Sequence, residues 1–465
     1  MTKEEKALDQ KYIEMTTLPI HRLVVKLSIP TIISMMVTSI YNVVDAAFVG
    51  RLSTEATAAI GVGFAYMTFI QAMGFFFGHG SGNHISRALG AKDRDDAAVI
   101  AAVGFFSPFV VGILSAIAGL LFLPQLCVFL GATPDVLDQT CKYLRYIILA
   151  SPFMMSALTM NNQLRLQGNA RFGMIGLVSG SILNIVLDPI FIFVLDMGVT
   201  GASLATAVGQ LFCWCLLFWG TRRPESVHIK LSNFKPSWYC YKEIAAGGLP
   251  SLGRQAFHCF SAIILNHAAA RWATPGTEAS SIAAFAVVSR TMMFCFSFVL
   301  GFCQGFQPVC GFNYGAKLYG RVRKSFVFTL RWSTIMLFVM GGLGFIFAPQ
   351  IIAIFRDEDP ELIAIGARAL RWQCVAFPLI GLSTATNMLF QNIRMTFRST
   401  LLSIGRQGIF FIPAILILPQ IWGLHGVEMT QAVADALTFA LSLPFAIWII
   451  RKLSTMEREE SGTQQ

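Results

Sequence analysis

Apolar runs of about 20 residues recur from one end of this 465-residue chain to the other, and each is long enough to cross a hydrocarbon core ~30 Å thick. Only 13% of the residues are charged, about half the share found in soluble domains. A soluble chain of this length would divide into domains joined by polar linkers, and no such linker is present. The pattern excludes a soluble enzyme and a disordered or fibrous chain, and it predicts an all-α integral membrane protein.

Twelve apolar spans can be counted in the sequence. They begin near Leu23, Ala56, Ala97, Cys141, Phe172, Gly201, Glu243, Ser280, Phe326, Gly366, Leu401 and Val427. Lys and Arg cluster at both termini and in alternate connectors, including Arg87, Lys92, Arg94, Arg165, Arg171, Lys317, Arg321, Arg394, Arg398 and Arg406. The positive-inside rule therefore places both termini in the cytoplasm, which requires an even number of spans. The net charge of +10 follows from this orientation and does not indicate a nucleic-acid partner.

The chain is a tandem repeat. A shift of about 220–226 positions brings Gly90-Ala91-Lys92 onto Gly315-Ala316-Lys317 and Pro124-Gln125 onto Pro349-Gln350, within a longer collinear series. Each half holds six spans, so the two halves share one orientation and form a parallel repeat. We predict two six-helix bundles: an N-lobe at 12–225 and a C-lobe at 236–453, followed by a polar cytoplasmic tail at 454–465. Two bundles in one chain favour a monomer.

Three acids lie deep within spans: Asp45 in the first, Asp188 in the fifth and Asp435 in the last. A charge in the bilayer core costs at least ~2.5–3.5 kcal/mol, so each is a functional candidate. Asp45, Asp188 and Thr206 lie roughly 6–10 Å from the outer ends of their spans, and Asn184 precedes Asp188 by one helical turn on the same face. We predict that these groups bind H⁺ or Na⁺. The alternative is structural: Asp45 caps local backbone, and Asn184 bonds a neighbouring helix.

The C-terminal half does not repeat this set. Under the repeat, Asp45 corresponds to Leu265, Asn184 to Gly408 and Asp188 to Ile412. Cation coupling is therefore assigned to the N-lobe.

Weaker candidates for a substrate cavity between the lobes are Met155, Arg290, Met293 and Asp435, since packing, lipid contact or snorkelling explains such residues as well. Glu428 and Asp196 lie nearer to span ends and are expected to reach water. No metal-ligand spacing is present, and the absence of G-x-x-x-x-G-K-[ST] leaves direct ATP drive unsupported. We expect no cofactor, no metal beyond Na⁺ at the acidic site, and no enzymatic activity.

Several segments together resemble the multidrug and toxic compound extrusion (MATE) family. They are Tyr41-Asn42-Val43-Val44-Asp45-Ala46-Ala47-Phe48-Val49-Gly50, Asn162-Gln163-Leu164-Arg165-Leu166-Gln167-Gly168, Leu183-Asn184-Ile185-Val186-Leu187-Asp188-Pro189 and Gly198 to Val208. The likeness covers nearly the whole chain and is greatest for the MepA-type bacterial branch.

This resemblance implies secondary antiport, in which inward H⁺ or Na⁺ drives the export of hydrophobic, often cationic drugs by alternating access across a bacterial cytoplasmic membrane. Carried across by position, the family's cation site falls on Asp45, Asn161, Asn184, Asp188 and Thr206. The seventh and tenth spans contain no embedded acid, which departs from relatives with a second acidic site and favours coupling through the N-lobe, with H⁺ ahead of Na⁺. Two alternatives remain open: a lipid-linked saccharide flippase of the same superfamily, and a non-transporting membrane receptor or scaffold.

Overall fold

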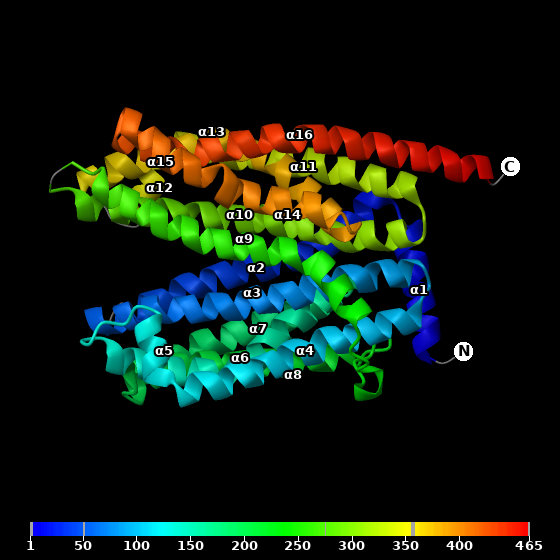
Figure 1. Ribbon diagram of the computed structural model, residues 1–465, viewed down its shortest axis with the longest axis horizontal. Helices are drawn as coiled ribbons and strands as arrows, with labels where there is room; N and C mark the ends of the chain where they lie inside the picture. Colours follow the sequence, from blue (N-terminus) through cyan, green and yellow to red (C-terminus); the bar gives the residue numbers. More distant parts are fainter. Residues whose placement is uncertain (1–2, 50–51, 275, 355–358, 464–465) are drawn as a thin grey trace.

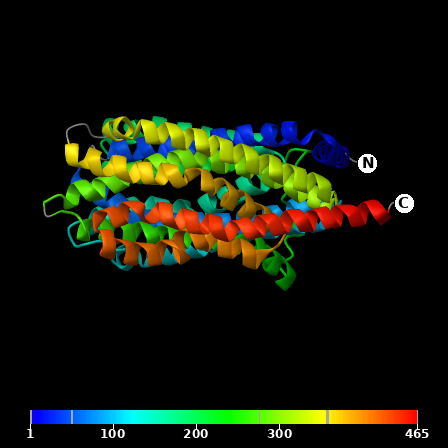
Figure 2. The same cartoon turned by 90° about the horizontal axis from the view of Figure 1, so that it is seen from above.

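The computed structural model describes residues 3–49, 52–274, 276–354 and 359–463, and these residues form helices and connecting turns without strands. The long helices gather into two lobes that lie side by side with their axes nearly parallel (Figure 1). Both termini lie at the same end of the molecule, which agrees with an even number of spans (Figures 1 and 2). We call this end the terminal end and the other the far end.

The first lobe contains six of the long rods in the described part of the chain. Their bounds are α2 Ile20–Val49, α3 Thr54–Gly90, α4 Arg94–Leu121, α6 Leu137–Leu166, α7 Ala170–Pro189 continued by the π-helix η1 Ile190–Val194, and α8 Gly198–Thr221. A short helix, α5 Leu123–Phe129, lies between α4 and α6. The expected spans begin three to four residues inside these helices, apart from an offset of two residues at α3 and α7.

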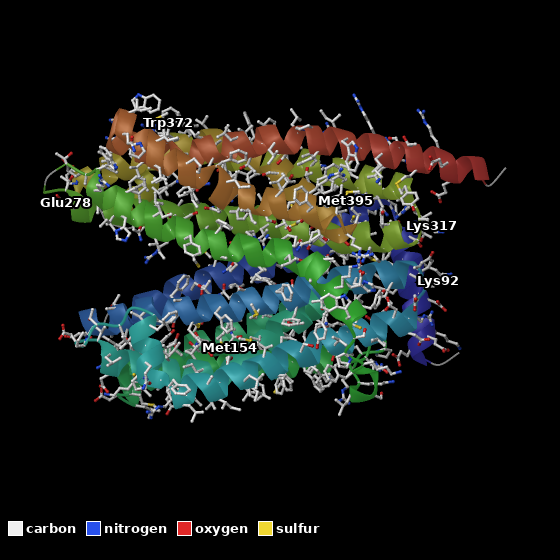
Figure 3. The ribbon with its side chains drawn as sticks, in the orientation of Figure 1. Lys92, Met154, Glu278, Lys317, Trp372 and Met395 are labelled. Carbon is white, nitrogen blue, oxygen red and sulfur yellow. The ribbon has the colours of Figure 1, made fainter. Side chains whose placement is uncertain are left out.

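The second lobe repeats this order. Its rods are α9 Trp238–Arg271, α10 Glu278–Gly315, α11 Tyr319–Ile346, α13 Pro360–Asn392, then α14 Thr396–Ile404 continued by the π-helix η3 Gly405–Ile409 and α15 Phe411–Trp422, and finally α16 Leu424–Thr463. The short helices are α12 Ala348–Ala353 and, in the linker before this lobe, η2 Leu231–Asn233. Lys92 and Lys317, paired by the repeat, adopt the same positive φ (62° and 61°) and both lie at the terminal end (Figure 3).

Two of the twelve rods, α6 and α9, are more polar than an ordinary membrane span, whereas the other ten are long and apolar enough to cross a bilayer. Most of α6 is buried inside its own lobe. A helix shielded from lipid can carry polar side chains, because neighbouring helices satisfy them. This is why α6 tolerates Asn161, Asn162 and Gln163 in succession.

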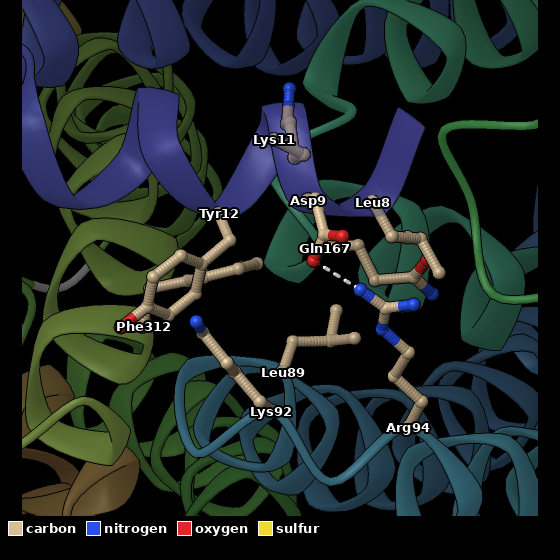
Figure 4. Close-up of a pocket in the computed structure, with 9 residues that line it drawn as sticks. All are labelled: Leu8, Asp9, Lys11, Tyr12, Leu89, Lys92, Arg94, Gln167 and Phe312. Carbon is tan, nitrogen blue, oxygen red and sulfur yellow. Dashed lines mark hydrogen bonds and ion pairs between the residues drawn. The ribbon is translucent and has the colours of Figure 1, made fainter. Parts of the chain in front are cut away.

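The N-terminal segment forms a helix of its own, α1 Lys3–Thr17, which lies across the terminal end (Figure 1). Figure 4 shows how α1 contacts the first lobe. Lys92 Nζ lies over the Tyr12 ring, 4.5 Å from the ring centroid, and Asp9 forms an ion pair with Arg94. The backbone carbonyl of Met15, near the end of α1, accepts a hydrogen bond of 3.1 Å from Asn313 of the other lobe. The helix therefore touches both lobes. At the opposite terminus, the polar tail predicted from residue 454 continues α16 as far as Thr463.

The lobes meet along the halves of their helices nearer to the terminal end. Ser28 of α2 donates to the Phe302 carbonyl of α10 at 3.0 Å, and Ser86 of α3 donates to the Pro308 carbonyl at 3.3 Å. The contact is close enough that a Cβ on Gly301 of α10 would lie 2.7 Å from the Ile32 Cα of α2. Small residues permit such approach between membrane helices.

Glu243 of α9 is buried at the centre of this interface and is shared by several basic side chains. Its carboxylate accepts from His84 Nδ1 at 3.1 Å, lies 3.5 Å from Arg87 and pairs with Arg394. His84 also pairs with Asp96. This network of five charged or titratable groups joins α3 and α4 of the first lobe to α9 and the loop after α13 of the second.

The lobes separate toward the far end. Ser297 of α10 bonds Ser39 of α2 at 2.8 Å, and Met293 and Arg290 lie one and two turns further along the same face of α10. Both are exposed, Met293 to 54% of its surface. Similarly, Gln255 of α9 bonds Gln71 of α3 at 3.2 Å, whereas His258 in the next turn is exposed. Faces that touch at the terminal end thus open to solvent at the far end, as the divergence of the lobes in Figure 1 also shows.

Candidate functional site

Asp45 near the end of α2 and Asp188 at the end of α7 lie next to each other in the first lobe, close enough for their carboxyl groups to interact directly. Asp188 is fully buried and Asp45 is half-buried. One oxygen of Asp188, Oδ1, has no partner among the described residues. The two acids predicted to act together are therefore in contact.

Asn184 and Thr206 complete this cluster. With its amide oriented to suit both neighbours, Asn184 donates from Nδ2 to Asp188 Oδ2 at 3.0 Å and accepts at Oδ1 from the Thr206 backbone N–H at 3.0 Å. All three side chains are buried. The predicted grouping of Asp45, Asn184, Asp188 and Thr206 at one level of the lobe agrees with these contacts.

Two tyrosines join the cluster that the sequence reasoning did not single out. Tyr41 of α2 lies near Thr206 and both acids, and Tyr143 of α6 lies near both acids. Both rings are buried. Gly63 of α3 makes room for Tyr143, since a Cβ there would lie 2.6 Å from the ring. Tyr41 could have been found from the sequence, because it lies one helical turn before Asp45. No sequence feature indicated Tyr143, because its contact is made between helices that are distant in the sequence.

Close packing of α7 against α8 positions Asn184. A Cβ on Gly180 of α7 would meet the Gly209 carbonyl of α8 at 2.9 Å, and one on Gly209 would meet Asn184 Cβ at 3.0 Å. The helices approach because these positions lack side chains. Pro189 cannot donate to the carbonyl one turn earlier, and the backbone after it winds as the π-helix η1, a feature often found at functional sites.

The structure does not bring Asn161 to this cluster. Asn161 lies near the terminal end of α6 and donates to the Gly173 carbonyl at 3.0 Å. Gly173 precedes Asp188 by 15 positions on α7, which is about 22 Å along a helix. The placement of Asn161 in the cation site is therefore wrong. The family position fell near the correct helix but at the wrong end, and α6 contributes Tyr143 instead.

The candidates for a substrate cavity divide. Arg290 and Met293 face the opening between the lobes, as described above. Met155 is fully buried in the core of the first lobe, so its placement in a cavity is wrong. Asp435 is buried and paired with Arg406, whose Nε donates to Asp435 Oδ1 at 2.6 Å.

Three residues assigned to water or to connectors are embedded instead. Glu428 was expected to reach water, but it is buried and accepts from Arg368 at 2.9 Å and pairs with His425 at 2.9 Å. Arg406 lies within η3 inside the eleventh rod, and Arg165 is buried at the end of α6. Each has a hydrogen-bonding partner that compensates for burial. Asp196 is exposed, as expected.

The equivalent positions in the second lobe are apolar. Leu265 packs in a hydrophobic cluster with Phe411, and a Cβ on Gly408 would lie 2.6 Å from the Phe257 ring. Among the described residues of either lobe, no group of three His, Cys, Asp or Glu side chains is arranged to hold a metal ion. The acidic cluster of Asp45 and Asp188 therefore has no counterpart at these described positions of the second lobe.

A pair of parallel six-helix lobes, separated at one end and with two embedded acids facing each other in the first lobe, is the architecture of a membrane transporter. The MatE family model matches residues 30–190 and 250–416, and the chain belongs to the MatE family. It is a multi-pass membrane transporter and not an enzyme.

Individual relatives agree with this assignment. The chain is 26% identical over 455 residues to the multidrug export protein MepA of Staphylococcus aureus, covering 95% of this chain and 96% of that protein. It is 25% identical to MepA of Staphylococcus haemolyticus, with coverage of 93% and 94%.

Solved structures agree as well. A MATE protein in complex with MaL6 superposes with a TM-score of 0.88 at 26% identity, covering 96% of this chain and 99% of that one. An outward-facing multidrug resistance MATE family transporter of the MOP superfamily also gives 0.88 at 26% identity, with coverage of 96% and 98%.

Proposed function

We propose that this protein is a proton-coupled antiporter that exports hydrophobic and cationic compounds by alternating access. The observation that carries the proposal is the close approach of the Asp45 and Asp188 carboxyl groups inside the first lobe. Two carboxylates in such contact cannot both be ionised, because like charges repel strongly where water is excluded. A proton, or another cation, must join them.

A proton fits this arrangement directly, since one proton between the two carboxyl groups would form a hydrogen bond and remove the repulsion. Na⁺ is the second candidate. Asp188 Oδ1 has no partner in the described chain, and Thr206 and Asn184 add oxygen atoms of the kind that Na⁺ prefers. Loss of the cation would leave two facing charges, which would push α2 and α7 apart. Occupancy of the site and packing of the lobe are thereby linked.

This link would couple the cation to transport. The positive-inside rule assigns the terminal end to the cytoplasm, so the far end, where the lobes diverge, faces outward. The interface around Glu243 closes the cytoplasmic side in this arrangement. Cation binding would favour one arrangement of the lobes and substrate the other, each by its difference in affinity for the two.

Substrate class and location rest on the relatives. Their names describe multidrug export in bacteria, and 95% of this chain aligns with them. We therefore assign the protein to a bacterial cytoplasmic membrane, as a monomer, with small hydrophobic or cationic drugs as substrates. Both acids give such cations a counter-charge in a low-dielectric surrounding.

The test is ethidium efflux from proteoliposomes driven by an imposed pH gradient or an imposed Na⁺ gradient. We expect the pH gradient to drive wild-type efflux, and Asp188→Asn and Asp45→Asn to lower the driven rate at least tenfold. Asp196→Asn is the matched control, because it removes an exposed acid eight positions after Asp188 in the same lobe. Efflux driven only by the Na⁺ gradient would show that the coupling ion is Na⁺ and not H⁺. Full activity in both site variants would reject Asp45 and Asp188 as the coupling site.

A further inference from the structure

Basic side chains outnumber acidic ones where the opening between the lobes ends. Arg254 of the second lobe lies within electrostatic range of Arg165 of the first lobe, and His258, one turn after Arg254, lies within range of both Arg254 and Arg406. Among the described residues, the carboxylate that pairs with one of these basic residues is Asp435, which forms an ion pair of 2.6 Å with Arg406. The basic residues therefore carry a net positive charge within the membrane-spanning part of the protein.

Arg254 lies at the boundary between the closed and open parts of the interface. On α9, Ser251 one turn before it bonds His79 of α3 at 2.9 Å, and Gln255 directly after it bonds Gln71 at 3.2 Å. In the following turn the face of α9 is exposed at His258. Arg254 is half-buried and lies within electrostatic range of His79 and Arg165 across the interface.

Among the described residues, the Arg254 guanidinium has no recorded hydrogen bond or ion pair. Arg165 behind it is held by neutral acceptors only: the Gln304 carbonyl at 2.9 Å, Gln307 Oε1 at 2.7 Å and Asn162 Oδ1 at 2.8 Å. Its buried Nε has no partner in the same part of the chain. Neither arginine forms an ion pair with a carboxylate of the described residues.

Burying a guanidinium without a counter-ion is costly, so the buried Arg165 and the half-buried Arg254 near it are functional candidates. Its planar fork of N–H donors matches the two oxygens of a carboxylate or the oxygens of a phosphate. We propose that Arg254, with Arg165 behind it, is a binding subsite for an anionic oxygen group of the transported compound. The inference rests on the proposed export function and extends its substrates from cations to amphiphiles that carry a carboxylate.

The experiment uses the full-length protein in nanodiscs and two forms of one rhodamine dye: the cationic ester and the free carboxylic acid. The two forms differ only at the group that Arg254 would bind. We expect wild type to bind the acid at least tenfold more tightly than Arg254→Gln does, with ester binding unchanged within twofold. Arg254→Lys should keep part of the affinity, since it keeps the charge without the fork. Arg271→Gln, at the far end of the same helix, is the matched control.

The anionic group could come from the compound or from a lipid headgroup, and lipid composition separates these sources. Nanodiscs of phosphatidylcholine alone are compared with nanodiscs containing phosphatidylglycerol. Weaker binding of the acid in the second set would mean that lipid phosphate competes for the same subsite. Unchanged binding would assign the subsite to the compound.

Equal loss of acid and ester binding in Arg254→Gln would overturn the proposal, as would equal loss in Arg271→Gln. If Arg254→Gln does not fold, wild type is compared with Arg254→Lys instead. The subsite is rejected if wild type does not bind the acid more tightly than Arg254→Lys does. Export of the ester by wild type tests the export function separately, so the two proposals can fail independently.

Discussion

The two lobes share one helical plan but treat their embedded acids in opposite ways. In the first lobe, Asp45 and Asp188 face each other, with no basic partner recorded for either among the described residues. In the second, Asp435 is paired with Arg406 and Glu428 with Arg368. The repeat thus preserved the order of the helices, while the chemistry of the embedded acids diverged.

This difference separates two carboxyl groups that face each other from carboxylates that are held in ion pairs. A carboxylate paired with an arginine ties its two helices together. Two facing carboxyl groups repel each other unless a cation lies between them. Under the proposed function, only the first lobe needs such a site, and the second lobe serves as its partner.

The largest expected effect concerns the fixed pair. Arg406→Gln leaves Asp435 buried without its counter-charge and should destabilise the protein by about 3–5 kcal/mol in thermal or chemical unfolding. Adding Asp435→Asn should recover most of this loss. Asp45→Asn should cost no more than about 1 kcal/mol, because an amide replaces a carboxyl group that already shares a proton. Similar losses of stability in Arg406→Gln and Asp45→Asn would contradict this difference between the two lobes.

The next prediction concerns the packing that shapes the acidic site. Gly63→Ala places a Cβ 2.6 Å from the Tyr143 ring and should cost about 1–3 kcal/mol in unfolding, because the ring must move. The displaced ring should also lower cation-driven efflux. Gly61→Ala is the control: a Cβ there meets no atom within 4 Å. Equal behaviour of the two variants would mean that Tyr143 is not held by this contact.

The contact between the lobes gives the third prediction. Glu243→Gln removes the anion shared by His84, Arg87 and Arg394, and should shift the balance toward opening at the terminal end by about 1–3 kcal/mol. Distances between spin labels at Lys92 and Lys317, in a background without native cysteines, report the opening. Glu428→Gln is the control, since its partners lie within one lobe. It should weaken that lobe and leave the distance distribution unchanged.

The smallest effect is expected at the surface. Glu14 of α1 pairs with Lys26 and Lys11; burial raises its pKa, but the two lysines outweigh burial and hold the pKa below its ordinary value. Because the folded pKa is depressed, the stabilisation is present above the unfolded pKa and is lost as pH falls through the folded pKa. Glu14→Gln should therefore loosen α1 by no more than about 1 kcal/mol at neutral pH, and by less in acid.

Hydrogen exchange of α1 amides measures that effect. Arg323→Gln, which removes the 3.0 Å pair with Glu457 beneath the second lobe, should leave α1 unchanged and loosen the end of α16 by a similar small amount. A large effect of either variant would show that α1 and the end of α16 hold the lobes together more strongly than surface ion pairs do.

Much of the fold could be predicted from the sequence. Apolar runs of membrane-spanning length define the helices because the bilayer imposes one length on every span. Collinear landmarks such as Gly90-Ala91-Lys92 and Gly315-Ala316-Lys317 define the repeat, since each turn needs the same backbone conformation. The depths of Asp45 and Asp188 also follow from counting residues along a helix. Such properties are local, and the sequence by itself determined them.

Tertiary structure alone decided which side chains meet. Residue counting gave the depth of Arg406, Arg165 and Glu428 only approximately, and it could not show that partners on other helices make their burial possible. It placed Met155 beside a cavity, although the lobe core surrounds it. Tyr143 reaches the acids through space cleared by Gly63 on another helix. Contacts between distant helices depend on packing, and packing is not a property of any one segment.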